Sequence, residues 1–292
     1  MNPETRAAAI ALYDRYTHGG MDRRAFMADL TKLAGSAAAA NALLLGIAAD
    51  PAAAAIVPAN DPRLQTRTLT WELLPGRKMS GYGAAPVNAA PTLPLVLVIH
   101  ENRGLNEHIR DVARRVALAG FSAVAPDFLS PSGGTPANED QAREMIGKLD
   151  LATAVADGRA MIQWLNSPAG GSRKVGAVGF CWGGAMVNRL AVAAGPALSA
   201  GVSFYGPAPE PAEAAKVQAA MLIHLAALDE RVNKTGLPWI EALRAAGKRV
   251  TGTVHPGVNH AFHNDTSAER YNQPAAEAAW AATVAFFRTH LA

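Results

Sequence analysis

The sequence predicts an α/β fold, a doubly wound and mostly parallel sheet flanked by helices, with an N-terminal helical extension. Two observations predict this class. From residue 61 to the end of the 292-residue chain, short apolar runs alternate with stretches of helical periodicity. One of these runs, 93–100, is aliphatic almost throughout, as in a central parallel strand that is covered on both faces. No repeat or internal linker interrupts residues 61–292, so we expect them to form one domain.

Residues 1–60 differ from the rest because they are rich in alanine. Within them, Ile10–Tyr16 followed by two glycines predicts a helix with a glycine stop. Arg23 and Arg24, followed by a phenylalanine, an uncharged stretch and small residues, resemble a twin-arginine export signal with cleavage near Ala52–Ala55. Two interpretations remain open: a signal that directs the protein to the periplasm, or helices that stay folded on a cytoplasmic protein. No later charge pattern marks a stable membrane span.

The strands of the main domain are predicted where apolar or alternating residues form short runs. They are 67–73, 78–84, 93–100, 122–125, 174–178, 200–204, 220–225 and 249–255. Helices are predicted between them where apolar residues recur at helical spacing. They follow a cap at Asn106, span 139–149, 152–165 and 185–194, include 241–243, and end the chain around 280–291.

Composition excludes several classes of function. The net charge is +3, and the 27 basic and 24 acidic residues are interspersed, so no nucleic-acid partner is expected. A single cysteine excludes an internal disulfide and a cysteine-based zinc site. The eight histidines do not lie at metal-ligand spacing, so neither a metal nor another cofactor is expected. The oligomeric state is not determined by these features.

The single cysteine lies in the sequence Gly179-Phe180-Cys181-Trp182-Gly183, between an apolar strand and a helical stretch. Strand, glycine turn and helix are typical of a nucleophile elbow, in which the glycines relieve a turn too tight for side chains. The usual nucleophile of such a turn is serine, and here it would be a thiol. A buried cysteine in an ordinary strand-to-helix turn is the alternative interpretation.

A cysteine nucleophile needs a base and a group that orients the base. Asp229 follows Cys181 by 48 residues, in a loop after a strand, and His260 follows by a further 31, in a loop after the last strand. Nucleophile, acid and histidine therefore occur in the chain order of an α/β-hydrolase triad, with all three at the carboxyl edge of the sheet. Taken singly, Asp229 is equally well explained as a helix cap and His260 as a solvated loop histidine.

These motifs resemble the dienelactone hydrolase (carboxymethylenebutenolidase-like) family, thiol-dependent members of the α/β-hydrolase superfamily. The resemblance extends from about Trp71 to Phe287 and is carried by residues 100–106, 120–127, 178–184, 205–206 and 256–262. It implies the α/β-hydrolase fold, a Cys181-His260-Asp229 triad, and a fourth residue, Glu101, that helps to activate the thiol. It also implies an oxyanion hole formed by the backbone N–H groups of Asn102 and Trp182.

The sequence departs from this family at a position that binds the substrate in dienelactone-hydrolysing members. Family members that act on dienelactone hold its carboxylate with two arginines, and the position of one of them, four residues after the catalytic histidine, is Asn264 here. Arg143 is a candidate for the other, and Arg103 is typical of a bacterial subgroup. We therefore expect hydrolysis of small-molecule esters or lactones through a thioester acyl-enzyme, with dienelactone disfavoured. Arg103, Tyr205 and Phe262 are the predicted substrate-binding residues.

Two other functions remain to be compared with this one. A glutamine-amidotransferase-like enzyme also places a cysteine on a glycine elbow, but its partner motif is His-x-Glu, and His260 is followed by Ala261 and Phe262. The second alternative is a catalytically silent binding protein on an α/β-hydrolase fold, because fold alone does not determine function.

Overall fold

The computed structural model describes residues 3–48 and 55–292. An eight-stranded sheet forms the centre of the molecule, with the strand order β1-β2-β4-β3-β5-β6-β7-β8. β2 pairs with β1 on one side and with β4 on the other, both in antiparallel fashion, and all the other neighbours are parallel. The strands are β1 Leu64–Leu74, β2 Arg77–Pro86, β3 Leu95–Ile99, β4 Ser122–Asp127, β5 Val175–Phe180, β6 Ala200–Phe204, β7 Ala220–Ala226 and β8 Val250–His255.

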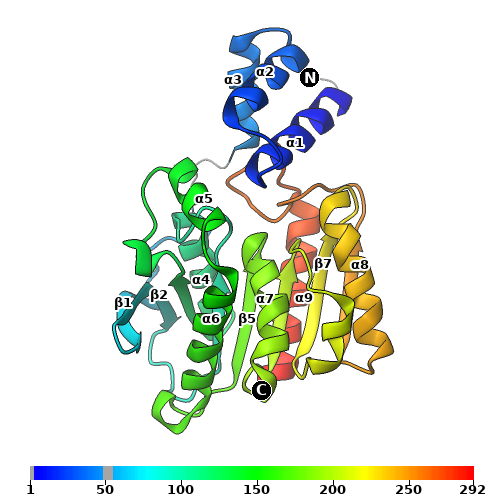
Figure 1. The fold of residues 1–292 in the computed structure, drawn as a ribbon. Helices are drawn as coiled ribbons and strands as arrows, with labels where there is room; N and C mark the ends of the chain where they lie inside the picture. The colour runs from blue at the N-terminus through cyan, green and yellow to red at the C-terminus, as the bar shows by residue number, and fades with distance from the viewer. Residues whose placement is uncertain (1–2, 49–54) are drawn as a thin grey trace.

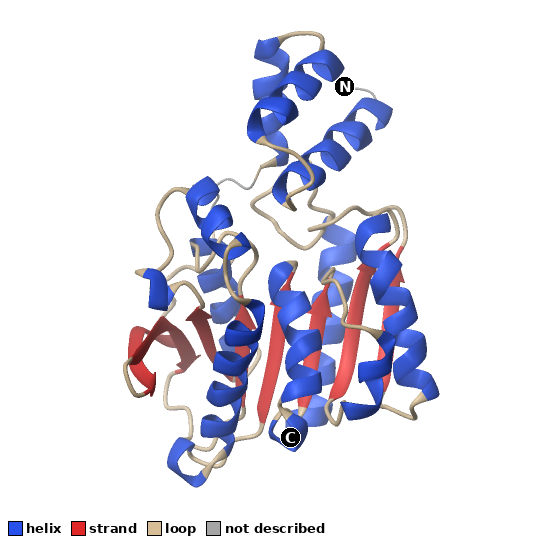
Figure 2. Ribbon diagram, in the orientation of Figure 1, coloured by secondary structure: helices blue, strands red, loops and turns tan. Residues whose placement is uncertain are grey.

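Helices cover both faces of this sheet, as Figures 1 and 2 show. Apolar side chains of α4 and α9 form one core against the sheet, and those of α6, α7 and α8 form the other. The central strands β3, β5, β6 and β7 are buried along their whole length because they lie between these two layers. The helices are α4 Glu107–Leu118, α5 Glu139–Gly147, α6 Leu151–Asn166, α7 Trp182–Ala193, α8 Glu230–Ala245 and α9 Gln273–Leu291.

The fold class and all eight predicted strands are confirmed, with ends that differ by a few residues. The predicted cap at Asn106 is also confirmed, because its side chain accepts a hydrogen bond from the Ile109 N–H at 3.2 Å. α7 begins at Trp182 rather than at Ala185. Its first turn holds Gly183 and Gly184, which have poor helix propensity but pack directly against the neighbouring strands.

Three helices, α1 Pro3–Thr17, α2 Arg23–Ala34 and α3 Ala37–Ile47, lie over one end of the sheet, and we call them the N-terminal cap (Figure 1). They share a small apolar core in which Tyr16 stacks on Phe26 at 4.6 Å between ring centroids. The twin arginines Arg23 and Arg24 lie in the first turn of α2. The predicted cleavage region, 52–55, lies outside the described residues except for Ala55.

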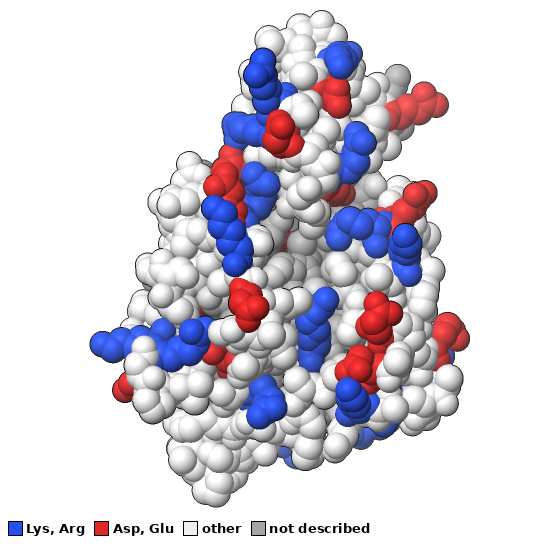
Figure 3. All heavy atoms as spheres, viewed as in Figure 1, with Lys and Arg blue, Asp and Glu red and all other residues white. Residues whose placement is uncertain are grey.

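Polar contacts attach the cap to the main domain. The Ile47 carbonyl accepts hydrogen bonds from Ser267 and Arg270, and Arg6 forms an ion pair with Glu269. Figure 3 shows acidic and basic side chains interspersed over this face of the molecule, with both signs present near the junction. Within the described residues no single helix is long and apolar enough to span a membrane; α2 and α3 reach that length only as a pair bent by 109°.

Candidate active site

Cys181 lies at the turn between β5 and α7, with φ of 55° and ψ of −112°. A non-glycine residue rarely adopts a positive φ, and such strain is concentrated at functional turns. The turn also requires its glycines. A Cβ on Gly179 would lie 2.1 Å from the Gly183 carbonyl oxygen, and a Cβ on Gly183 would lie 2.2 Å from the Ile99 carbonyl oxygen. Strand, turn and helix therefore have the geometry of a nucleophile elbow.

The Cys181 side chain points to the end of the sheet that the cap covers, and the residue is only 5% exposed. It precedes the first turn of α7, where the partial positive charge of the helix N-terminus favours a thiolate. A cavity of about 570 Å³ lies elsewhere, between the β1–β2 hairpin and α6, and is lined by Trp71, Met161 and Trp164. Because that cavity is remote from the cysteine, we do not assign it to this site.

Asp229 and His260 meet beside the elbow. The Nδ1 of His260 donates to Oδ2 of Asp229 at 2.5 Å, and the other carboxylate oxygen of Asp229 caps α8 by accepting from the Val232 N–H at 3.2 Å. The Asp229 carboxylate therefore caps α8 and contacts His260 at the same time. His260 is 1% exposed, and its Nε2 is buried without a hydrogen-bond partner among the described residues.

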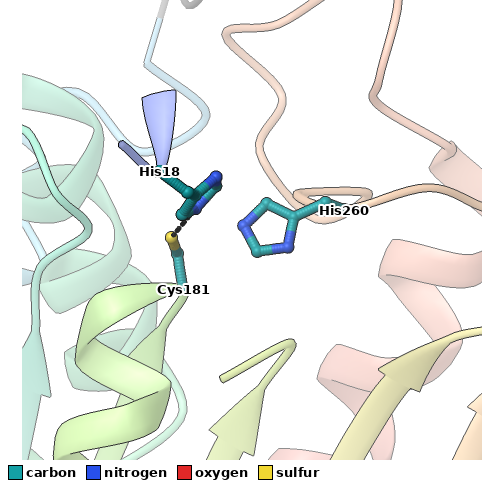
Figure 4. A group of neighbouring side chains, drawn as sticks. All are labelled: His18, Cys181 and His260. Carbon is teal, nitrogen blue, oxygen red and sulfur yellow. Dashed lines mark hydrogen bonds between the residues drawn. The ribbon is translucent and has the colours of Figure 1, made fainter. Parts of the chain in front are cut away.

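A second histidine, which the sequence did not point to, reaches the thiol from the cap. His18 follows the last residue of α1, and its Nε2 lies 3.3 Å from Sγ of Cys181 (Figure 4). Its Nδ1 lies 2.7 Å from the Asp14 carbonyl oxygen. The His18 and His260 rings meet edge to face, with centroids 4.9 Å apart. Cys181 is thus flanked by two imidazoles.

These neighbours shift the pKa values of the site. Burial raises the pKa of the Cys181 thiol, but the charges of His260 and His18, together with the hydrogen bond from His18, outweigh it and lower this pKa to about 6. Burial lowers the pKa of His260, whereas Cys181 and Asp229 raise it, with a net result of about 10. Burial raises the pKa of Asp229 as well, and His260 brings it below its usual value. At neutral pH the arrangement favours a thiolate beside an imidazolium.

Glu101 lies just beyond the end of β3 and is 7% exposed. Its Oε2 accepts from the Asn264 Nδ2 at 2.8 Å, and its Oε1 lies 3.5 Å from the Tyr205 hydroxyl. Burial, and then the charge of Glu101, raise the pKa of Tyr205 well above its ordinary value. Asn264, at the position expected of a substrate-binding arginine, is fully buried against this carboxylate.

The two candidate arginines contact the cap. Arg103 is 9% exposed and forms an ion pair with Glu139 and a hydrogen bond to the Tyr13 hydroxyl. Arg143 donates to the Tyr16 hydroxyl at 2.9 Å, with its guanidinium 4.3 Å from the centre of that ring. Both cations therefore already have partners in α1.

The remaining predicted residues lie close to the elbow. Tyr205 is completely buried with its ring 5.0 Å from that of His260, and Phe262 is completely buried against Tyr205 at 5.5 Å. Trp182 is the first residue of α7, so its N–H is one of those that have no partner within the helix. The side chain of Asn102 donates to the Thr17 carbonyl oxygen of the cap at 3.0 Å.

His18, Cys181 and His260 could also hold a metal ion. One ligand atom from each lies within 4.8 Å of the other two, and two imidazoles with one thiolate are donors that zinc accepts. The same three groups are fully explained as an acid–base cluster around a thiol, so this geometry alone does not indicate a resident metal.

Comparisons with known proteins show the family of the chain. The model of the "Dienelactone hydrolase family" matches residues 79–291. The chain belongs to the dienelactone hydrolase family. A "Putative carboxymethylenebutenolidase" of Methylorubrum extorquens is 32% identical over 224 residues, covering 72% of this chain and 76% of the relative. One from Escherichia coli O157:H7 is 29% identical over 257 residues, covering 83% of this chain and 94% of the relative.

Solved structures extend the comparison with the dienelactone hydrolase family. A "Putative Dienelactone Hydrolase" from Klebsiella pneumoniae superposes with a TM-score of 0.67 at 29% identity, covering 77% of this chain and 99% of that one. A dienelactone hydrolase from Anabaena variabilis, at 20% identity and a TM-score of 0.62, shares the fold. The chain is therefore a hydrolase of the class that acts on esters or lactones. The family match begins within β2, so the N-terminal cap lies outside it.

Sequence reasoning missed two residues of this site. His18 gave only a weak signal, a histidine just before the glycine stop of the first helix. Asn264 was noted as the absence of an arginine, whereas the structure gives it a contact of its own with Glu101. Neither contact follows from spacing along the chain.

Proposed function

We propose that this protein hydrolyses carboxylic esters or lactones with Cys181 as the nucleophile and a thioester acyl-enzyme as the intermediate. One observation supports this more than any other. His260 is held by Asp229 through Nδ1 at 2.5 Å, while its Nε2 is buried without a partner among the described residues, in a cluster that includes Sγ. A base oriented on one side and free on the side of a thiol is what nucleophilic catalysis requires.

In the first half of the proposed reaction, the Cys181 thiolate attacks the carbonyl carbon and a tetrahedral oxyanion forms. The backbone N–H groups of Trp182 and Asn102 would stabilise that oxyanion, and each such donor is worth about 3 kcal/mol. The intermediate then collapses to a thioester as the C–O bond breaks. His260, as an imidazolium, supplies the proton that the leaving alkoxide takes.

In the second half, a water molecule hydrolyses the thioester. Neutral His260 takes a proton from the water, and the resulting hydroxide adds to the thioester carbonyl. The C–S bond breaks, which releases the carboxylic acid and restores the thiolate beside an imidazolium. The low thiol pKa of about 6 supports this step, because a stable thiolate is a good leaving group.

For the substrate, we propose an ester or lactone that is not held by the arginine pair of the dienelactone enzymes. Asn264 is buried on Glu101, and Arg103 and Arg143 are engaged by tyrosines of α1. A bidentate carboxylate clamp needs a guanidinium with free donors facing the substrate. The contacts of these side chains therefore argue against dienelactone itself.

We further propose that residues 61–292 form the hydrolase domain and that residues 1–60 are an added unit. The sheet and the family match both lie within the first of these ranges. The cap has an apolar core of its own, which includes Tyr13, Phe26 and Leu30.

The test is the Cys181→Ala variant assayed on a short p-nitrophenyl ester, with an intact-mass search for the acyl adduct. We expect a loss of at least about 10³-fold in kcat and no adduct, as when a catalytic nucleophile is removed. Cys181→Ser should retain only weak activity, since the site is built to ionise a thiol. Undiminished turnover by Cys181→Ala would reject the proposal. If the wild-type protein hydrolyses no ester, lactone or thioester of a panel, the silent binding protein is the better account.

A further inference from the structure

His18 touches the reacting sulfur, although it comes from a part of the chain that the family match does not include. It is 163 residues away from Cys181 in the sequence. Contacts of α1 with the residues around the elbow hold it in place. They include the hydrogen bond from Asn102 to the Thr17 carbonyl oxygen and those from Arg103 and Arg143 to Tyr13 and Tyr16.

The hydrogen bonds of His18 determine what its Nε2 does. A carbonyl oxygen only accepts, so the Asp14 carbonyl at 2.7 Å places a proton on Nδ1. In neutral His18, Nε2 is then an acceptor, and at 3.3 Å it accepts the proton of the Cys181 thiol. In charged His18, Nε2 donates to a thiolate. Either way one proton lies between Sγ and Nε2, and both contacts of the ring are satisfied.

We propose that His18 is a catalytic residue of this hydrolase: its Nε2 takes the proton of the Cys181 thiol and, as an imidazolium, holds the thiolate. This inference rests on the proposed role of Cys181 as the nucleophile. The step breaks the S–H bond and forms an N–H bond, with the electron pair left on sulfur.

With this assignment, His18 and His260 have different roles in the reaction. His260 is oriented by Asp229 and its Nε2 has no partner among the described residues, so it remains free to act on the leaving group and on water. During acylation the thiolate charge passes to the alkoxide, which takes one proton from the imidazole pair. During deacylation a water proton returns to the pair as the thiolate is restored. Protons therefore balance over a turnover.

Other ionisable groups lie around His18 and Cys181. His260 after β8 and Tyr205 after β6 interact with the thiol. Asp229 after β7 interacts with His260, Glu101 after β3 and Arg270 before α9 interact with Tyr205, and Asp14 on α1 pairs with Arg270. His18 is distinguished from all of these by its hydrogen bond to Sγ.

The test compares His18→Gln with His290→Gln, a matched change at a partly exposed histidine in the last turn of α9. Glutamine keeps a donor near the sulfur but takes no proton. Since Cys181 is the only cysteine of the chain, the rate of alkylation by iodoacetamide against pH reports its ionisation alone. We expect His18→Gln to shift the alkylation midpoint up toward about 8.5, and His290→Gln to leave it unchanged.

The same variants are assayed on a p-nitrophenyl ester. We expect kcat/KM of His18→Gln at neutral pH to fall by about 10²-fold, as on loss of a positioned base. For a second measurement, His18→Ala is given free imidazole, which should restore activity in proportion to its unprotonated concentration.

Each outcome decides the inference. An unchanged alkylation midpoint in His18→Gln would overturn it, whatever the effect on turnover. A rise in turnover would overturn it too, because the cap would then merely cover the thiol. If Cys181→Ala remains active, the proposed nucleophile is wrong, and the alkylation midpoint still decides whether His18 shares a proton with this thiol.

Discussion

Asp229→Asn separates the two roles that one side chain performs. In the native protein, Oδ1 of Asp229 caps α8 while Oδ2 accepts from Nδ1 of His260. Asparagine keeps one oxygen for the cap, where it is as effective as aspartate. Its amide then faces the ring nitrogen as a donor, so the imidazole must carry its proton on Nε2. In that tautomer His260 no longer accepts a proton from water.

The expected size of both effects follows from comparable changes in other proteins. Forcing the wrong tautomer on a catalytic histidine costs about 10⁴-fold in kcat when the rest of the site is intact. We therefore expect Asp229→Asn to lose about 10³- to 10⁴-fold in kcat and to denature close to the wild-type temperature. Asp229→Ala loses the cap as well, which costs about 1 kcal/mol. For a protein of this size, that lowers Tm by about 2 °C.

The assay is ester hydrolysis at saturating substrate, with thermal denaturation of the same three samples. Asp229→Asn within about tenfold of wild-type kcat would refute the tautomer argument. An Asp229→Ala variant as stable as the wild type would refute the capping role. An activity loss found only together with a loss of stability would show that the carboxylate acts through α8 and not through His260.

Three further expectations concern pH, the elbow and the buried acid. The pKa of Cys181 is lowered to about 6 and that of His260 is raised to about 10. We therefore expect kcat/KM to rise as the pH passes 6, because the thiolate forms, and to fall above 10, because the imidazolium is lost. A pH profile with a single inflection near about 8.5 would contradict this. Gly179→Ala should lower the free energy of unfolding by about 3 kcal/mol or more, because the new Cβ meets a backbone oxygen at 2.1 Å. The control is Gly147→Ala, whose Cβ meets nothing within 4 Å, and equal Tm values for the two would be inconsistent with a tight elbow. Asn264→Ala should lower the free energy of unfolding, measured by chemical denaturation, by about 1–3 kcal/mol, because Oε2 of the buried Glu101 loses its hydrogen-bond donor. An unchanged denaturation midpoint would show that water replaces the amide.

Much of this arrangement is predictable from the sequence because it depends on local patterns. The sheet strands are short apolar runs, and the elbow is marked by glycines that leave no room for side chains. Asp229 and His260 could be predicted as partners because parallel strands bring the loops at their carboxyl ends together. To predict the proposed triad, one therefore needs only the order of the elements along the chain.

The environment of the proposed triad is not predictable in the same way. His18 reaches Cys181 only because the cap docks on the main domain, and docking depends on polar contacts between segments far apart in the sequence. Arg103 is a plausible anion-binding residue by position, yet its guanidinium is committed to Glu139 and Tyr13. Side-chain partners of this kind are set by tertiary packing, for which the sequence carries no local pattern.

The docking of the cap on the elbow has a consequence for the design of truncated variants. A fragment cut to the family boundaries, 79–291, would begin inside β2 and would lack β1, the cap and the imidazole of His18. The shortened β2 would keep its pairing with β4 but lose β1, and the sulfur would lose one of its two basic neighbours. A weak or insoluble fragment would then be a property of the cut and not of the protein, so kinetic comparisons with relatives should use residues 1–292.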